Sequence, residues 1–333
     1  MENEPNVPKS LLEATRYFQD PNVCVEFMAQ IRWPLGIECP HCQSQRHSFL
    51  RSRRIWKCLA CRKQFSAKVG TIFEDSAIPL DKWLTAVWLL VNNKNGISSW
   101  ELHRALKVGQ KAAWFMLQRI RHALGQTGAQ TPNEQFGGNG PIEIDESFVG
   151  GKVKNMHKSR KRKLHQLRDA VVRPDHYMGK TVVMGMLDRG LRQVRAKVVP
   201  NTKRETLQAQ ILKEVFPGAK VYTDEHTGYM GLEKKFAHEM VNHLETYVDG
   251  KVHTNGIENF WSLLKRGLNG TYVAVEPFHL FRYVDEQVFR YNNRATKDNP
   301  LNDSDRFLLA MHQVIGKRLT YAQVTGKDEA RQF

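Results

Sequence analysis

Two pairs of cysteines constrain the fold of this chain more than any other feature. Cys39 and Cys42 form "CPHC", Cys58 and Cys61 form "CLAC", and residues 43–57 lie between the pairs. Each C-x-x-C turn presents two thiolates, and two such turns at this separation can bind one Zn²⁺ with a hairpin between them. We therefore predict a zinc ribbon over residues 36–73. Four thiolates close the coordination shell, so the ion would be structural rather than catalytic.

Two other uses of the cysteines fit less well. A redox C-x-x-C is normally single and near a βαβ unit, and disulfides require an oxidising compartment. The N-terminal residues "MENEPNVPKSLL" lack the blocks of a signal peptide, and the most apolar run, "WLTAVWLLV" (83–91), is too short to span a bilayer. We expect a cytoplasmic protein without a membrane partner, in which Cys24 is a plain buried thiol.

The charge balance favours a polyanionic partner. The chain of 333 residues carries 50 Lys and Arg against 34 Asp and Glu, a formal net charge of +16. Basic side chains gain affinity by displacing counterions from phosphates, so we expect nucleic acid; a solvated basic surface is the alternative. The hairpin between the cysteine pairs fits this expectation, since Arg51, Arg53 and Arg54 precede Trp56 and can contact a phosphate backbone. The alternative is that these basic residues are exposed only because the small zinc module has too little core to bury them.

Pattern changes along the chain predict a multidomain α+β protein. The predicted order is a helical lead-in (1–35), the zinc ribbon (36–73), a helical domain (74–124), a linker (125–140), an α/β domain (141–300) and a helical C-terminal tail (301–333). The α/β domain should contain strands at "PIEIDES", "KTVVMGML", "RQVRAKVV", "KVYTD" and "EMVNHLE", with helices at 203–215 and 256–267.

Residues 97–124 are typical of a helix-turn-helix. Ser98 or Ser99 can cap the first helix and Gly109 lies in the turn. In the second helix, Trp114, Leu117, Ile120 and Leu124 form the predicted buried stripe. Lys111, Gln118, Arg119, Arg121 and His122 fall largely off that stripe, as in a basic recognition helix. Any pair of antiparallel helices in a basic protein could show the same pattern.

Three acids are the candidate metal ligands of the α/β domain. Asp145 and Asp224 each end an alternating strand, and Glu258 opens a helix. A single strand-end Asp is more often a cap, but three such acids can converge at one point. Mg²⁺ prefers oxygen ligands, and two ions about 4 Å apart can activate an attacking oxygen and stabilise the leaving one.

The spacing of these acids belongs to a larger set of motifs. Residues 225–257 separate Asp224 from Glu258, and Lys265 follows two helical turns later. With the cysteine pairs, "IEIDESFVGGK", "VYTDEHTGY", "HTNGIENFWSLLKRGLNGTY" and "FRYVDEQVFRYNNR", the chain resembles the DDE transposases of bacterial insertion sequences. It is most similar to the group that joins an N-terminal zinc ribbon to a ribonuclease-H-like catalytic domain, and the resemblance covers nearly the whole chain.

The resemblance implies a site and an activity. Asp145, Asp224 and Glu258 would bind two Mg²⁺ ions, for which Mn²⁺ could substitute, and Lys265 would grip DNA near the scissile phosphate. In parts of the group an Asn replaces the third acid, so Asn255 is the alternative to Glu258; a carboxylate is the better Mg²⁺ ligand. The enzyme would bind the terminal inverted repeats, hydrolyse a phosphodiester at each end, and join the 3′-hydroxyls to target DNA as a dimer or larger assembly.

Other residues could support this chemistry. Glu146 should point to the opposite face of its strand from Asp145, so it is the weaker candidate. His226 and His253 could each orient water, contact phosphate or be structural. Residues 150–163 should form a basic loop that could contact DNA or could be only a solvated charged loop; its basic residues are Lys152, Lys158, Arg160, Lys161, Arg162 and Lys163. Arg266, on the helix of Lys265, could also contact DNA. The rival functions are a metal-dependent nuclease without strand transfer and a zinc-ribbon DNA-binding regulator.

Overall fold

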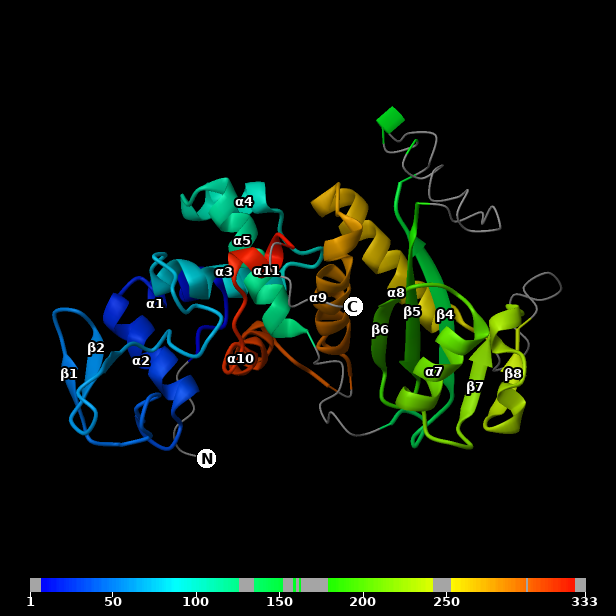
Figure 1. Cartoon of the computed structure of the whole chain (residues 1–333), viewed down its shortest axis with the longest axis horizontal. Coiled ribbons are helices and arrows are strands. Elements are labelled where there is room, and N and C mark those ends of the chain that lie inside the picture. The colour runs from blue at the N-terminus through cyan, green and yellow to red at the C-terminus, as the bar shows by residue number, and fades with distance from the viewer. Residues whose placement is uncertain are drawn as a thin grey trace. The chain divides into compact units, whose positions relative to one another are not determined.

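The computed structural model divides the chain into two compact units. It describes residues 7–125, 135–151, 158, 159, 162, 179–241, 253–297 and 299–326. The first unit contains the N-terminal residues up to Gly125 together with residues 293–333, and the second contains residues 126–292 (Figure 1). The C-terminal segment is helical, as predicted, but it belongs to the N-terminal unit rather than forming a separate tail.

Helices make most of the first unit. They are α1 (Leu11–Tyr17), α2 (Pro21–Arg32), α3 (Leu80–Asn92), α4 (Ser99–Leu106), α5 (Gln110–Leu124), α10 (Asp303–Gln313) and α11 (Tyr321–Val324). Phe307 of α10 is fully buried against Phe18, Phe27 and Trp88. This aromatic cluster joins the C-terminal segment to the lead-in helices, because each ring removes a large apolar area from water.

The ribbon is a small antiparallel sheet in the order β1-β2-β3. Its strands are β1 (His47–Leu50), β2 (Ile55–Cys58) and β3 (Gln64–Phe65). Trp56 of β2 is only 4% exposed, stacks on Phe65 and meets the edge of Trp33. Trp56 therefore belongs to the ribbon's core.

Helices α4 and α5 are joined by a short turn and pack against each other. Ser98 caps α4 in a capping box with Glu101, and Lys107 in the left-handed region leads into the turn. The burial of α5 differs from the prediction. Trp114 is only half-buried, whereas Gln118, Arg119 and Arg121 are at most 5% exposed.

The buried arginines have a structural explanation. Helix α5 contacts α3, α4, α10 and α11, so more than one of its faces is covered. The Arg119 guanidinium donates hydrogen bonds to the carbonyl oxygens of Leu319 and Glu74, at 3.0 and 2.9 Å. The prediction that Arg119 and Arg121 are exposed for DNA binding is wrong in this structure. Lys111 remains exposed at the start of α5.

The second unit is built on a five-stranded mixed sheet in the order β6-β5-β4-β7-β8. Its strands are β4 (Ile142–Val149), β5 (Thr181–Asp188), β6 (Gln193–Val199), β7 (Lys220–Thr223) and β8 (Ala237–Met240). Strands β4, β5 and β6 pair antiparallel, whereas β7 runs parallel to β4 and β8 runs parallel to β7. Strand β4 is therefore central. Four of the five predicted strands are present over most of their range, whereas β8 overlaps the predicted segment "EMVNHLE" only at Glu239 and Met240, and residues 242–245 lie outside the described residues.

Helices cover both faces of this sheet (Figure 1). On one face, Leu207 and Ile211 of α7 (Arg204–Glu214) pack against Ile142 and Ile144 of β4. The other face is covered by α8 (Asn255–Arg266) and α9 (Leu280–Asn292). Short helical turns are η2 (Thr227–Tyr229), η3 (Leu232–Lys234), η4 (Gly267–Tyr272) and η5 (Pro277–His279). No helix among the described residues combines the length and apolar character needed to cross a membrane.

Candidate active site and metal centre

The four cysteines of the ribbon form a compact cluster of ligand atoms. Their Sγ atoms all lie within 4.8 Å of one another, with Cys39 to Cys61 at 3.7 Å and Cys42 to Cys58 at 3.6 Å. A tetrahedral Zn²⁺ with Zn–S bonds of about 2.3 Å holds its sulfurs about 3.8 Å apart. The backbone N–H of Cys61 donates to Cys58 Sγ and lowers the pKa of that thiol to about 6. The cluster therefore fits a structural zinc ion.

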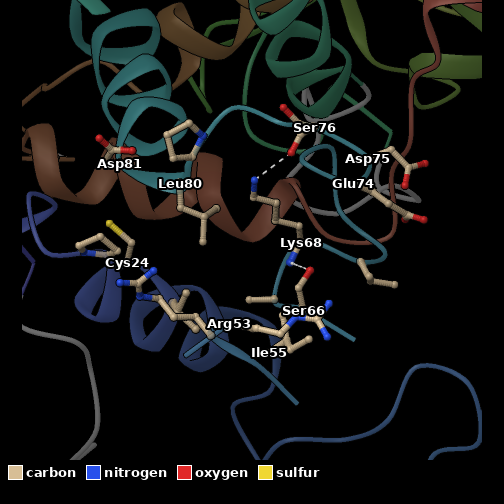
Figure 2. A pocket seen from close by; sticks show the side chains of 16 residues that line it. Cys24, Arg53, Ile55, Ser66, Lys68, Glu74, Asp75, Ser76, Leu80 and Asp81 are labelled. Atoms are coloured by element: carbon tan, nitrogen blue, oxygen red, sulfur yellow. Dashed lines mark hydrogen bonds between the residues drawn. The ribbon is translucent and has the colours of Figure 1, made fainter. Parts of the chain in front are cut away.

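Basic side chains of the ribbon hairpin border a cavity of about 660 Å³ (Figure 2). Arg53 and Arg54 line it from the hairpin, and Asp81 lines it from the start of α3. Lys68 Nζ donates to the carbonyl oxygens of Ser76 and Ile78, and burial lowers its pKa. This cavity thus mixes cations with acids. The exposed outer surface of the hairpin, which includes Arg51, is better suited to a phosphate backbone.

Asp145 lies near the middle of the central strand β4, on the face covered by α8. Its Oδ1 accepts the backbone N–H of Glu146 at 2.8 Å, and its Oδ2 accepts the indole N–H of Trp261 at 2.9 Å. Strand pairing sets Asp145 opposite Gly185 of β5. The alternation of β4 explains this placement, since Ile142 and Ile144 occupy the opposite face.

The other two acids approach from the neighbouring strand and from α8. Asp224 directly follows β7, the parallel neighbour of β4, and its Oδ1 accepts the backbone N–H of His226 at 3.1 Å. Glu258 lies in the first turn of α8, where its Oε1 accepts a hydrogen bond from Thr254 Oγ1 at 3.0 Å. The Glu258 side chain is exposed, whereas that of Asp224 is half-buried.

The three acids interact electrostatically. Burial, followed by the charges of Asp224 and Glu258, raises the pKa of Asp145 to about 6. Like charges around a largely buried carboxyl disfavour its ionised form, and a cation would relieve that repulsion. Across the residues that the structure describes, only the cysteines gather three or more ligand atoms within 4.8 Å. The oxygens of Asp145, Asp224 and Glu258 therefore do not all lie that close.

Glu143, another acid on β4, was not identified from the sequence. Glu143 is 1% exposed, and its carboxylate accepts the backbone N–H of Ile257 in α8 at 2.8 Å and Arg189 Nε at 2.6 Å. Arg189 also donates to the carbonyl oxygen of His253 at 2.6 Å. Glu143 is two residues before Asp145, so the period of a strand could have indicated that both acids share one face.

Three remaining candidates have structural partners. Glu146 accepts a hydrogen bond from the buried Tyr229 hydroxyl, and burial raises the pKa of Glu146 to about 8. Tyr229 belongs to the core on the α7 side of the sheet, which confirms that Glu146 and Asp145 point to opposite faces. His226 Nδ1 accepts the N–H of Gly228, and His253 lies against Arg189 and Glu143.

The basic candidates of the second unit are exposed wherever they are described. Lys265 and Arg266 end α8, on the exposed side of the helix, and Asn255 is exposed at its start. Lys158 and Arg162 are also exposed. Lys152, Arg160, Lys161 and Lys163 lie outside the described residues. Glu258 and Lys265 share an exposed side of α8 because Ile257, Phe260, Trp261 and Leu264 fill the buried side.

Comparisons with known proteins agree with this arrangement. The model of the ISXO2-like transposase domain matches residues 138–292, which include the sheet, the three acids and α8. The model of the transposase zinc-ribbon domain matches residues 20–64, which include all four cysteines. The chain belongs to the ISXO2-like transposases. Members of this class are nucleotidyl-transfer enzymes of insertion sequences, and the matched residues contain both the ribbon and the acids.

A curated relative extends the similarity beyond the two domains. The chain is 31% identical, over 254 residues, to an uncharacterized protein in transposable element ISH50 of Halobacterium salinarum. The match covers 73% of this chain and 81% of the relative. It therefore spans more residues than the two domain models together, which supports a shared organisation of the two proteins.

The cysteine cluster gives a first testable prediction. We expect Cys58→Ser to reduce bound zinc from about one ion per chain to about none, because three thiolates and a hydroxyl bind Zn²⁺ far more weakly than four thiolates. Zinc content measured by atomic absorption on purified protein tests this. Cys24→Ser is the matched control, since Cys24 is a buried thiol that donates to the carbonyl oxygen of Phe18. Equal zinc in both variants would contradict the assignment.

The raised pKa of Asp145 gives a second prediction. An acid that binds Mg²⁺ must lose its proton, and in the metal-free protein Asp145 keeps its proton below a pH of about 6. We expect Mn²⁺ affinity to be constant above about pH 7 and to fall about tenfold per pH unit below 6. Calorimetric titration between pH 5 and 8 measures it. Glu146→Gln should keep this profile, and an affinity independent of pH would refute the prediction.

Proposed function

We propose that this protein is an active DNA transposase of its insertion sequence. It binds the terminal inverted repeats, cleaves a phosphodiester at each end and joins the resulting 3′-hydroxyls to target DNA. The observation that carries the proposal is that the charges of Asp224, at the end of the parallel neighbouring strand, and Glu258, on one helix, both act on Asp145 of the central strand. Their mutual repulsion at Asp145, together with the family match, is what a divalent-cation site for phosphoryl transfer requires.

The sheet supports a ribonuclease-H-like catalytic domain. The order β6-β5-β4-β7-β8, with three antiparallel strands followed by two parallel ones, agrees with the fold that the sequence resemblance implies. In this arrangement Asp145 lies on the central strand, Asp224 at the end of the adjacent strand, and Glu258 on the helix that covers them. We propose these three residues as the magnesium ligands, with Asn255 as the alternative third ligand.

The two steps use the same chemistry with different nucleophiles. First, a water oxygen attacks the phosphorus at the element's end, and the bond to the 3′ oxygen breaks to leave a 3′-hydroxyl and a 5′-phosphate. That hydroxyl then attacks a target phosphorus and displaces the target's own 3′ oxygen. Bound Mg²⁺ would activate the attacking oxygen and stabilise the leaving one. Asp145, Asp224 and Glu258 would supply the oxygen ligands. Because water and the 3′-hydroxyl attack phosphorus directly, no covalent bond to the protein forms.

DNA would contact both units. In the N-terminal unit we propose Arg51, Arg53, Arg54 and Lys111, which are exposed, in place of the buried Arg119 and Arg121. In the second unit, Lys265 and Arg266 lie on the exposed side of α8 and can hold the backbone near the scissile phosphate. Joining two ends in one event requires a dimer or a larger assembly on DNA. We place the reaction in the cytoplasm, where the DNA is.

A strand-transfer assay tests this function. Labelled, pre-cut DNA from the ends that flank the native gene would be incubated with plasmid and Mg²⁺ or Mn²⁺. We expect the wild type to join DNA and Glu258→Gln to reduce joining at least about 10³-fold, because an amide neither carries the charge nor binds Mg²⁺ as a carboxylate does. Asn255→Ala is the matched control one turn earlier on the same helix.

The outcomes separate the rival functions. If Asn255→Ala is inactive and Glu258→Gln is active, the third metal ligand is Asn255 rather than Glu258, and the proposed transposase reaction is unchanged. If the wild type cuts the ends but never joins them, the protein is a nuclease. If it binds the ends and neither cuts nor joins them with either metal, it is a DNA-binding regulator, and the proposal is wrong.

A further inference from the structure

Helix α8 carries more than the third acid of the site. Trp261, three residues after Glu258, lies on the buried side of α8 and is 4% exposed. Its indole N–H donates to Asp145 Oδ2 at 2.9 Å, so one helix both supplies Glu258 and grips the carboxylate on β4. Trp261 packs edge-on against Phe260 with ring centroids 5.1 Å apart, which limits the freedom of the indole.

The indole fits only because its neighbour on β5 has no side chain. Gly185 pairs directly with Asp145 across the strands. A Cβ atom added at Gly185 would lie 2.6 and 2.7 Å from Cζ2 and Cη2 of Trp261 and 3.0 Å from Cδ1 of Ile257. The two separations to Trp261 are closer than carbon atoms approach, and Trp261 is a rigid ring held by the core. The glycine therefore sets the position of the indole.

The hydrogen bond fixes the orientation of the Asp145 carboxylate together with a second donor. Oδ2 receives the indole N–H and Oδ1 receives the backbone N–H of Glu146, at 2.9 and 2.8 Å. Two fixed donors on a carboxylate hold its plane, while each oxygen keeps a lone pair. A metal ligand held in this way has little rotational freedom to lose when a cation binds. Partners of this kind typically affect metal affinity about 10- to 100-fold.

We propose that Trp261 and Gly185 form a positioning pair that presents Asp145 to the divalent cation. The proposal rests on the proposed function, because it takes Asp145 as a metal ligand. Trp261 touches neither DNA nor the reacting atoms in this role. It acts through the Asp145 carboxylate, and Gly185 acts through Trp261. The pair thus connects β5, β4 and α8 around the Asp145 carboxylate.

Direct Mn²⁺ binding to the full-length protein, measured by electron paramagnetic resonance, tests the pair without any DNA. We expect Trp261→Phe to weaken Mn²⁺ binding about 10- to 100-fold, since phenylalanine fills much of the site but lacks the N–H donor. Gly185→Ala should weaken binding similarly by displacing the indole. Leu280→Ala is the control: it removes a buried side chain of α9 from the same hydrophobic core, so it should lower the melting temperature and leave Mn²⁺ affinity unchanged.

The double variant distinguishes positioning from general damage. Phenylalanine lacks the Cζ2 and Cη2 atoms that a Cβ atom at position 185 would strike, so we expect Gly185→Ala to weaken Mn²⁺ binding in wild type and to add little in Trp261→Phe. The proposed role of the pair would be wrong if Gly185→Ala weakened Mn²⁺ binding equally in both backgrounds. It would also be wrong if Trp261→Phe bound Mn²⁺ with wild-type affinity. Asp145→Asn shows which claim fails: if it too binds Mn²⁺ normally, the metal site itself is wrong.

Discussion

The attachment of helix α8 to strand β4 is the interaction on which the site depends. The buried Glu143 carboxylate accepts the N–H of Ile257 in the first turn of α8 and pairs with Arg189. A negative charge at a helix N-terminus is favourable, because the unpaired N–H groups there carry partial positive charge. Removing one member of a buried pair costs about 3–5 kcal/mol, since the other charge is left in the interior. Without this attachment, neither Glu258 nor Trp261 would have a defined place beside Asp145.

The site combines rigid and yielding parts. Asp145 is largely buried and held by two donors, whereas Glu258 is exposed and bonded to Thr254 of its own helix turn. Three carboxylates near one another repel, and the raised pKa of Asp145 is the measure of that repulsion together with burial. A divalent cation reverses the sign of the interaction. The carboxylates that repel one another without metal would then bind the same cation. A rotation of the Glu258 side chain could bring the third carboxylate to it.

The patterns in the sequence that require only local chemistry were the most informative. The cysteine spacing predicted the zinc ribbon, and alternation along "IEIDES" placed Asp145 and Glu146 on opposite faces of β4. The prediction for α5 was wrong because of tertiary packing. Arg119 and Arg121 face solvent on a helical wheel, but neighbouring helices cover them in the structure. The role of Gly185 depends on a neighbour 76 positions along the chain, Trp261, and no local pattern encodes such a contact.

The measurement that tests the central claim most directly is metal-directed cleavage of the protein backbone. Fe²⁺ would replace Mg²⁺ in the purified protein, and hydroxyl radicals generated with ascorbate and peroxide would cut the chain next to the bound ion. If Asp145, Asp224 and Glu258 share one cation site, cuts should fall near all three positions and disappear together in excess Mg²⁺. Cuts near one acid alone, or cuts that excess Mg²⁺ does not suppress, would contradict a shared site.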